Sequence, residues 1–167
     1  MKESILDGKK ILAVDDEPDV LSLLEDEITA ACQRCTLDKA ITYEIALEKL
    51  KSQHYDLVIL DIMGVRGFDL LSMAVSRNQK VAMLTAHALS PEALKRSFEM
   101  RAMSYLPKEK LGEIVPFLED VLKYEYSPGW KRLMEKLKGF FDTRFESDWE
   151  KKTGLPWQEW GKHSGKE

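Results

Sequence analysis

The strongest constraint on how this chain folds is a set of three short runs that are apolar at every position. They cover residues 11–14, 57–60 and 81–84. A strand whose residues are all apolar is buried on both faces, as in a parallel sheet that helices cover on both sides. Two less distinct strands are expected near Thr36–Ala40 and Ser104–Pro107. The pattern therefore predicts a five-stranded parallel sheet.

Segments with helical periodicity alternate with these strands. Apolar residues follow the i, i+3, i+4, i+7 spacing of an amphipathic helix over residues 43–50 and 114–121, and a similar stripe covers residues 21–31. A weaker pattern, which opens with Ser-Pro-Glu, covers residues 90–101. Five successive βα repeats are typical of a doubly wound α/β domain. We place this domain at residues 8–125.

A second region begins near Tyr126, where the composition changes. We expect Ser127 to cap a new helix, with Pro128 at its first helical position. One face of this helix is apolar and consists of Trp130, Leu133, Met134, Leu137, Phe140 and Phe141. We assign residues 126–167 to an amphipathic helical extension that contains all four tryptophans of the chain.

The apolar face of this extension is expected to pack rather than to bind a ligand, since an aromatic stripe is more often core. Three partners stay open: the chain's own α/β domain, a second copy of the chain, or a target protein. Gly139 weakens the helix by roughly 1 kcal/mol relative to alanine. Residues 153–156 are expected to break the helix before Trp157 and Trp160, which share a short final turn.

Polar residues at the ends of the predicted strands define a candidate functional site. Asp15 and Asp16 follow the first strand, and Asp61 follows the third. Thr85 ends the fourth strand and Lys108 follows the fifth. In open α/β sheets, ligands bind at the carboxyl ends of the strands. We therefore expect these five side chains to converge on one edge of the sheet.

Three carboxylates in one shallow site repel each other, and a cation relieves that repulsion. Mg²⁺ fits best, because it takes oxygen ligands and commonly binds one or two carboxylates together with phosphate oxygens. In such a site Asp61 is placed as a carboxylate nucleophile that forms an aspartyl-phosphate. Lys108 would offer a positive charge, and Thr85 a hydroxyl donor, to the phosphoryl oxygens.

At these positions the chain resembles the response-regulator receiver family. Four blocks carry the resemblance: ILAVDDEPD at 11–19, YDLVILDIM at 55–63, MLTA at 83–86 and YLPK at 105–108. Each block alone is a weak signal, because apolar runs that end in aspartate are common. All four in order are specific, and together they cover roughly residues 8–125.

The resemblance implies a flavodoxin-like fold and a Mg²⁺-dependent phosphoaspartate at Asp61. It implies that Asp15, Asp16 and Asp61 hold the metal ion and that Met63 adds its backbone carbonyl. The phosphoryl donor would be a sensor histidine kinase or a phosphotransfer protein. The resemblance also implies a switch pair formed by Thr85 and Tyr105. In that pair the hydroxyl moves to the phosphoryl group and the aromatic ring turns inward.

Two positions depart from the pattern of that family. The loop after the phosphoacceptor lacks the usual proline and is about two residues short. Gly64 and Gly67 are expected to permit the tight or positive-φ turn that a shortened loop needs. Glu109 follows Lys108 where the family often has proline.

Composition narrows the remaining function classes. The chain has 167 residues, 44% of them hydrophobic and 32% charged, which is typical of a globular protein. Its net charge of -4 argues weakly against nucleic-acid binding. We expect no membrane segment, no secretion signal and a cytoplasmic location. Cys32 and Cys35 are expected to be reduced thiols near a helix end, although their C-x-x-C spacing also occurs in redox and zinc sites.

The sequence thus predicts a signalling receiver rather than an enzyme. Phosphorylation of Asp61 would switch a protein-protein interaction or the oligomeric state. A homodimer would use the C-terminal helix or the fourth and fifth helices of the receiver. Two alternatives stay open: a receiver-like adaptor that works without phosphorylation, and a transcription regulator whose tail binds DNA.

Overall fold

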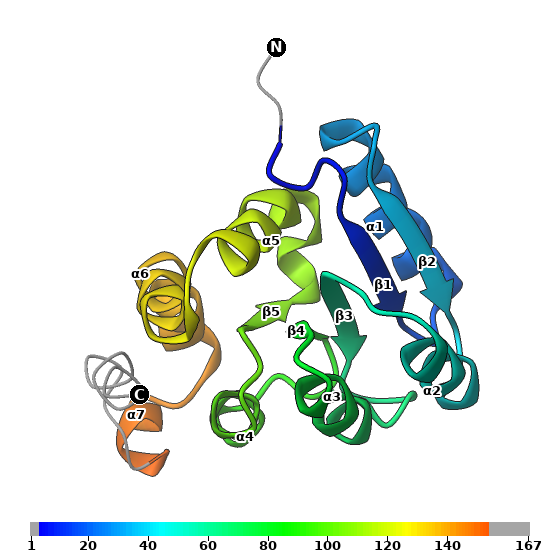
Figure 1. Ribbon diagram of the computed structural model, residues 1–167. Coiled ribbons are helices and arrows are strands. Elements are labelled where there is room, and N and C mark those ends of the chain that lie inside the picture. The colour runs from blue at the N-terminus through cyan, green and yellow to red at the C-terminus, as the bar shows by residue number, and fades with distance from the viewer. Residues whose placement is uncertain (1–3, 154–167) are drawn as a thin grey trace.

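The computed structural model describes residues 4–153 and contains a parallel sheet with helices on both faces (Figure 1). The strands are β1 (Lys10–Val14), β2 (Thr36–Ala40), β3 (Leu57–Asp61), β4 (Lys80–Thr85) and β5 (Ser104–Pro107). All neighbours pair in parallel, in the order β2-β1-β3-β4-β5. This order confirms the predicted flavodoxin-like fold, in which β1 and β3 lie next to each other where the strand order reverses.

The helices that connect the strands cover the two faces of the sheet (Figure 1). One face carries α1 (Pro18–Ala31) and α5 (Ile114–Lys123), and the other carries α2 (Tyr43–Ser52), α3 (Gly67–Ser76) and α4 (Pro91–Glu99). A 3-10 helix, η1 (Lys108–Glu113), joins β5 to α5. None of the described helices is long and apolar enough to span a membrane.

Burial explains why β2 is less distinct in the sequence than β1, β3 and β4. Every residue of β3 and β5 is buried, and so is every residue of β1 and β4 except the first lysine of each. By contrast, only Ala40 is buried in the edge strand β2, whereas the other edge strand, β5, is in contact with α6. An edge strand with one covered face needs no continuous apolar run.

The tail forms two helices, α6 (Tyr126–Arg144) and α7 (Trp149–Lys152). They lie beyond the β5 edge of the sheet, where α6 contacts α5 and β5, and α7 contacts α4 (Figure 1). Most of the predicted apolar face is buried there, namely Trp130, Leu133, Met134, Leu137 and Phe141, whereas Phe140 is only half-buried. Of the three partners left open by the sequence, the structure shows the chain's own α/β domain.

The predicted start of the tail helix is wrong by about two residues. Ser127 is not the cap, because α6 already begins at Tyr126, and Ser127 and Pro128 lie within its first turn. Proline is tolerated there, since the first N–H groups of a helix have no intrahelical partner. The ring of Tyr126 packs on Phe98 of α4 at 5.4 Å between centroids, which holds this end of the helix. Trp157 and Trp160 lie outside the described residues.

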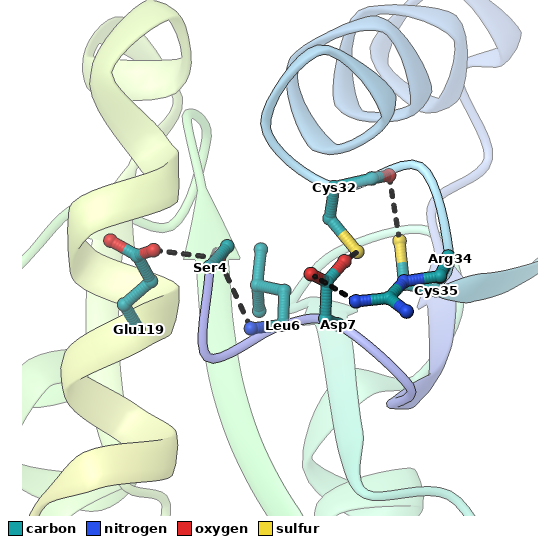
Figure 2. Close-up of polar contacts among 7 residues, drawn as sticks. All are labelled: Ser4, Leu6, Asp7, Cys32, Arg34, Cys35 and Glu119. Carbon is teal, nitrogen blue, oxygen red and sulfur yellow. Dashed lines mark hydrogen bonds and ion pairs between the residues drawn. The ribbon is translucent and has the colours of Figure 1, made fainter. Parts of the chain in front are cut away.

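The N-terminal segment bridges α5 and the end of α1 through polar contacts (Figure 2). Ser4 Oγ donates a hydrogen bond to Glu119 in α5 at 2.7 Å, and the thiol of Cys32 donates to Asp7 at 3.0 Å. Asp7 also pairs with Arg34 at 3.4 Å. Both cysteines are free thiols. Burial, reinforced by the contact with Asp7, raises the pKa of the Cys32 thiol to about 12, so it stays protonated and acts as a donor.

Candidate functional site

The three predicted carboxylates meet at the carboxyl edge of the sheet. Because Val14 of β1 pairs with Leu60 of β3, the next residues along the two strands, Asp15 and Asp61, lie side by side. One carboxylate oxygen from each of Asp15, Asp16 and Asp61 lies within 4.8 Å of the other two. Within residues 4–153 this is the only group of three or more carboxylate, histidine or cysteine side chains that could hold a metal ion. Asp15 and Asp61 are buried, whereas Asp16 is exposed.

Lys108 reaches into this cluster from the start of η1. Its Nζ lies 2.9 Å from Asp15 Oδ2 and 3.3 Å from Asp61 Oδ1. A further carboxylate, that of Glu17, lies 2.9 Å from the same nitrogen. Glu17 was not among the predicted site residues, although it is the third acidic residue of an unbroken run that begins at Asp15.

Burial shapes the electrostatics of this cluster. Burial first, and then the negative charge of Asp15, raises the pKa of Asp61 to about 6 despite the opposing effect of Lys108. Burial likewise raises the pKa of Asp15 above its usual value. For Lys108, burial alone would lower the pKa, but contacts with Glu17 and Asp15 outweigh it and raise the pKa on balance. The lysine therefore stays charged, yet one cation does not balance the buried acids.

The donor set fits a magnesium ion. It consists of carboxylate oxygens, which are the ligands that hard divalent cations prefer. One of these oxygens, Asp15 Oδ2, is buried and accepts no well-directed hydrogen bond, and its close contact is the ammonium group of Lys108. Met63 lies two residues after Asp61 in the β3–α3 loop, and 52% of its surface is exposed. Its apolar side chain offers no ligand to a hard cation, so only its backbone carbonyl has the right chemistry.

The shortened β3–α3 loop packs directly on the acids. Gly64 has φ +84°, and a Cβ at this position would lie 2.4 Å from a carboxylate oxygen of Asp16. A Cβ on Gly67 would lie 2.1 Å from the backbone oxygen of Asp61. The positive φ expected at one of these glycines is thus found at Gly64. The second left-handed residue of the loop is Arg66, at φ 53°. Gly67 has a different role, because its lack of a side chain lets the loop lie close to the backbone of Asp61.

Thr85 and Tyr105 both bind the loop between β4 and α4. Thr85 is buried at the end of β4, and its Oγ1 accepts a hydrogen bond from the N–H of Ala88 at 2.9 Å. The ring of Tyr105 is fully buried, and its hydroxyl donates to Ala88 O at 2.9 Å and accepts from Ser90 N–H at 3.1 Å. Burial raises the pKa of Tyr105, so the phenol stays protonated. Thr85 thus lies at the end of the strand that pairs with the strand of Asp61, and its hydroxyl is bonded to the loop.

Glu109, which stands where the related family often has proline, contacts the tail. Its carboxylate forms an ion pair with the guanidinium of Arg144 in the last turn of α6. Three further basic residues of α6, Arg132, Lys136 and Lys138, are also paired with acids. Arg132 and Lys136 both contact Asp120 of α5.

Comparison with known proteins gives a consistent result. A family model described as the response regulator receiver domain matches residues 11–118. The sensory transduction protein LytR of Staphylococcus haemolyticus is 37% identical over 101 residues, which cover 59% of this chain and 39% of that relative. The chain therefore matches less than half of the length of this curated relative.

Two solved structures illustrate the similarity in fold. A response regulator from Thermotoga maritima has a TM-score of 0.62 at 18% identity, over 70% of this chain and 98% of that one. A two-component response regulator from Clostridium difficile has a TM-score of 0.61 at 21% identity, over 69% of this chain and 96% of that one. The matched family region ends within α5, so α6 and α7 lie outside it.

Proposed function

The chain belongs to the response regulator receiver domain family, and on this premise we propose that it accepts a phosphoryl group on Asp61 in a Mg²⁺-dependent reaction. The observation that carries the proposal is the cluster of Asp15, Asp16 and Asp61 with Lys108 at the carboxyl ends of β1 and β3. The donor would be a phosphorylated histidine of a sensor kinase or of a phosphotransfer protein.

In the proposed reaction a carboxylate oxygen of Asp61 attacks the phosphorus. The bond between phosphorus and the imidazole nitrogen of the donor breaks as the new P–O bond forms, and the imidazole takes up a proton. Mg²⁺, held by the three aspartates and the backbone carbonyl of Met63, would supply positive charge to the phosphoryl oxygens. Lys108 already lies 3.3 Å from Asp61 and would bind one of those oxygens.

The output of the receiver would be a change in protein-protein interaction or in oligomeric state. We propose that residues 8–125 form the receiver and that residues 126–167 modify its output. Thr85 would turn its hydroxyl toward the phosphoryl group, with Tyr105 as its switch partner. A homodimer through α4 and α5 would have to share this surface with α6, which occupies part of it in the structure.

An adaptor that binds a partner without phosphorylation is the second candidate. One observation favours it: Lys108 is already paired with Asp15 and Glu17, so an incoming phosphoryl group must compete for the ammonium group. A DNA-binding tail gains no such support, because the basic residues Arg132 and Lys136 are paired with Asp120.

Intact-mass analysis after incubation with acetyl phosphate and Mg²⁺ tests the proposal. We expect one added phosphoryl group, and its loss both in Asp61→Asn and after addition of a chelator. Asparagine is nearly isosteric with aspartate but is not a nucleophile, so the variant controls for folding. No addition to a folded wild-type sample, or addition that persists in Asp61→Asn, would contradict the proposal. The first of these results would favour the adaptor.

A further inference from the structure

The tail places an aromatic ring against Tyr105. Phe141 of α6 and Tyr105 of β5 are both fully buried, with ring centroids 6.0 Å apart and ring planes inclined at 47°. Phe141 is fixed from its other side by a stacked contact with Phe145, at 5.3 Å and 4°, and by an edge contact with Trp149 at 6.1 Å. The ring of Tyr105 therefore has little room to rotate outward while α6 is docked.

From Tyr105, hydrogen bonds lead to Thr85, at the end of the strand that pairs with the strand of Asp61. The Tyr105 hydroxyl contacts Ala88 and Ser90, and the N–H of Ala88 donates to Thr85 Oγ1. A hydroxyl has one proton and two lone pairs, so accepting from Ala88 leaves the threonine proton to be donated elsewhere. Asp61 pairs across the sheet with Leu84, the residue before Thr85. The loop thus holds a hydroxyl donor beside the position that a phosphoryl group on Asp61 would take.

We propose that Phe141 is a positioning residue for the Asp61 site and acts through Tyr105 and the β4–α4 loop. This inference rests on the proposed phosphorylation of Asp61. Docking of α6 preorganises the loop, so less ordering is left for the moment when the phosphoryl group arrives. Because coupling between two sites is reciprocal, a phosphoryl group on Asp61 in turn strengthens the docking of α6.

A second contact joins the tail to the site. Arg144, in the last turn of α6, pairs with Glu109, which directly follows Lys108 in the chain. Both side chains are about half exposed, so the pair contributes little to the free energy with which α6 docks. It does fix the end of α6 that carries Phe141 next to the segment that carries the site lysine.

The first test measures the initial rate at which the full chain is phosphorylated by acetyl phosphate with Mg²⁺. We expect Phe141→Ala to lower this rate by about tenfold, because a loosened loop positions the hydroxyl less well, and a misplacement of about 1 Å can lower a rate by on the order of 100-fold. Phe141→Leu, which keeps most of the apolar volume, should retain most of the rate. Leu133→Ala is the matched control, because Leu133 is buried on the same face of α6 but lies beside Phe117 and Val121 of α5. Its rate should stay near that of the wild type.

The second test measures hydrogen exchange of the α6 amides with and without beryllofluoride and Mg²⁺, a phosphoryl-shaped probe. In the wild type the probe should slow the exchange. Tyr105→Phe keeps the ring against Phe141 but removes the hydroxyl that contacts the loop. In this variant α6 should remain docked, and the effect of the probe on its exchange should disappear. A purely structural role of the tail would not produce this loss.

The outcomes separate this inference from the proposed function. If the wild type is phosphorylated and Phe141→Ala reacts equally fast, or if the probe speeds up exchange in α6, only the inference is wrong. The assignment to Phe141 is also wrong if Leu133→Ala is equally slow. If the wild type neither reacts nor binds the probe, both proposals fail. If Phe141→Ala does not fold, the hydrogen-exchange test with Tyr105→Phe decides whether the inference holds.

Discussion

The acid site lies at the carboxyl ends of the strands, whereas the tail is docked beside the edge strand β5. The backbone holds the first region, and side chains hold the second. The acid site depends on the backbone: parallel strands bring Asp15 and Asp61 together, and Gly64 and Gly67 let the next loop approach them. The tail depends on side chains. Large aromatic residues of α6 fill the space beside α4 and β5, and Trp130 donates a hydrogen bond to Ala102 O at 2.8 Å.

This difference determines what each region tolerates. Strand register places the carboxylates whatever the surrounding apolar side chains are, provided that the sheet forms. The site should therefore be most sensitive to atoms added close to its backbone. A helix docked by a few large rings should instead be most sensitive to atoms removed from those rings. The four substitutions below test this contrast, from the largest expected effect to the smallest.

Trp130→Ala removes the largest fully buried side chain of α6. Its ring packs edge-on against Phe98 at 5.3 Å and donates to Ala102 O. We expect the free energy of unfolding to fall by about 4 kcal/mol, as for other buried tryptophans. Urea titration followed by circular dichroism measures this loss. Lys131→Ala, at the exposed neighbouring position, is the control, and an equally small effect of both changes would show that the tail is not firmly docked.

Gly67→Ala adds a single methyl group at the acid site. That group would lie 2.1 Å from the backbone oxygen of Asp61 and 2.7 Å from the Cα of Ile62, so the loop must move. We expect a loss of about 3 kcal/mol, at the upper end for overpacking against backbone, together with weaker Mg²⁺ binding. The control is Gly112→Ala, since a Cβ at Gly112 has no atom within 4 Å. If Gly67→Ala behaves like this control, the site does not depend on the close packing of its loop.

The sequence predicted the sheet and the convergence of acidic side chains at the carboxyl ends of its strands, because both follow from periodicity. Runs such as residues 57–60 are apolar because β3 is buried on both faces, and strand order then determines which strand ends are neighbours. Contacts made by side-chain length were not predictable in this way. Glu17 is one example, since its role depends on the reach of Lys108 across the site. The left-handed backbone of Arg66 was not predictable for a different reason, since it depends on the path of the whole loop.

The docking of the tail shows where prediction from sequence ends. An amphipathic stripe shows that α6 buries one face, but it carries no information on what covers that face. The covering surface comes from Phe98, Tyr105 and Phe117, which lie on three separate elements and give no joint signal in the sequence. The start of α6 was misplaced for a similar reason, because the contact of Tyr126 with Phe98 joins distant parts of the chain.

Asp61→Asn tests the electrostatic side of the site. In Mg²⁺-free protein the pKa of Asp61 is raised to about 6, so the folded state holds this proton more tightly than the unfolded state does. That contribution is complete at low pH and is lost as the pH rises through about 6. At pH 7.5 the variant should therefore be more stable than the wild type by about 3 kcal/mol, because the pKa of Asp61 rises from 3.8 to about 6 and each pKa unit corresponds to about 1.4 kcal/mol.

The measurement is a pair of thermal melts at about pH 4 and pH 7.5, with a chelator present, on both sides of the raised pKa. The gain in stability should vanish at the lower pH, where the wild-type carboxyl is protonated. Mg²⁺ should narrow the difference at the higher pH by stabilising the wild type alone. A gain that does not depend on pH would show that the buried charge of Asp61 is not its cause.

Gly139→Ala is the counterpart of Gly67→Ala in the tail, and we expect it to raise the free energy of unfolding where Gly67→Ala lowers it. Gly139 lies inside α6, it is exposed, and a Cβ there would have no atom within 4 Å. Alanine loses less backbone entropy on folding than glycine, so the free energy of unfolding should rise by about 0.5–1 kcal/mol. Urea titration measures the gain, with Gly129→Ala as the matched change near the start of the same helix, where the added Cβ only touches Tyr124 at 3.7 Å. A loss of stability at Gly139 would mean that the exposed face of α6 makes a close contact in solution, and the contrast between a backbone-held site and a side-chain-held tail would then need revision.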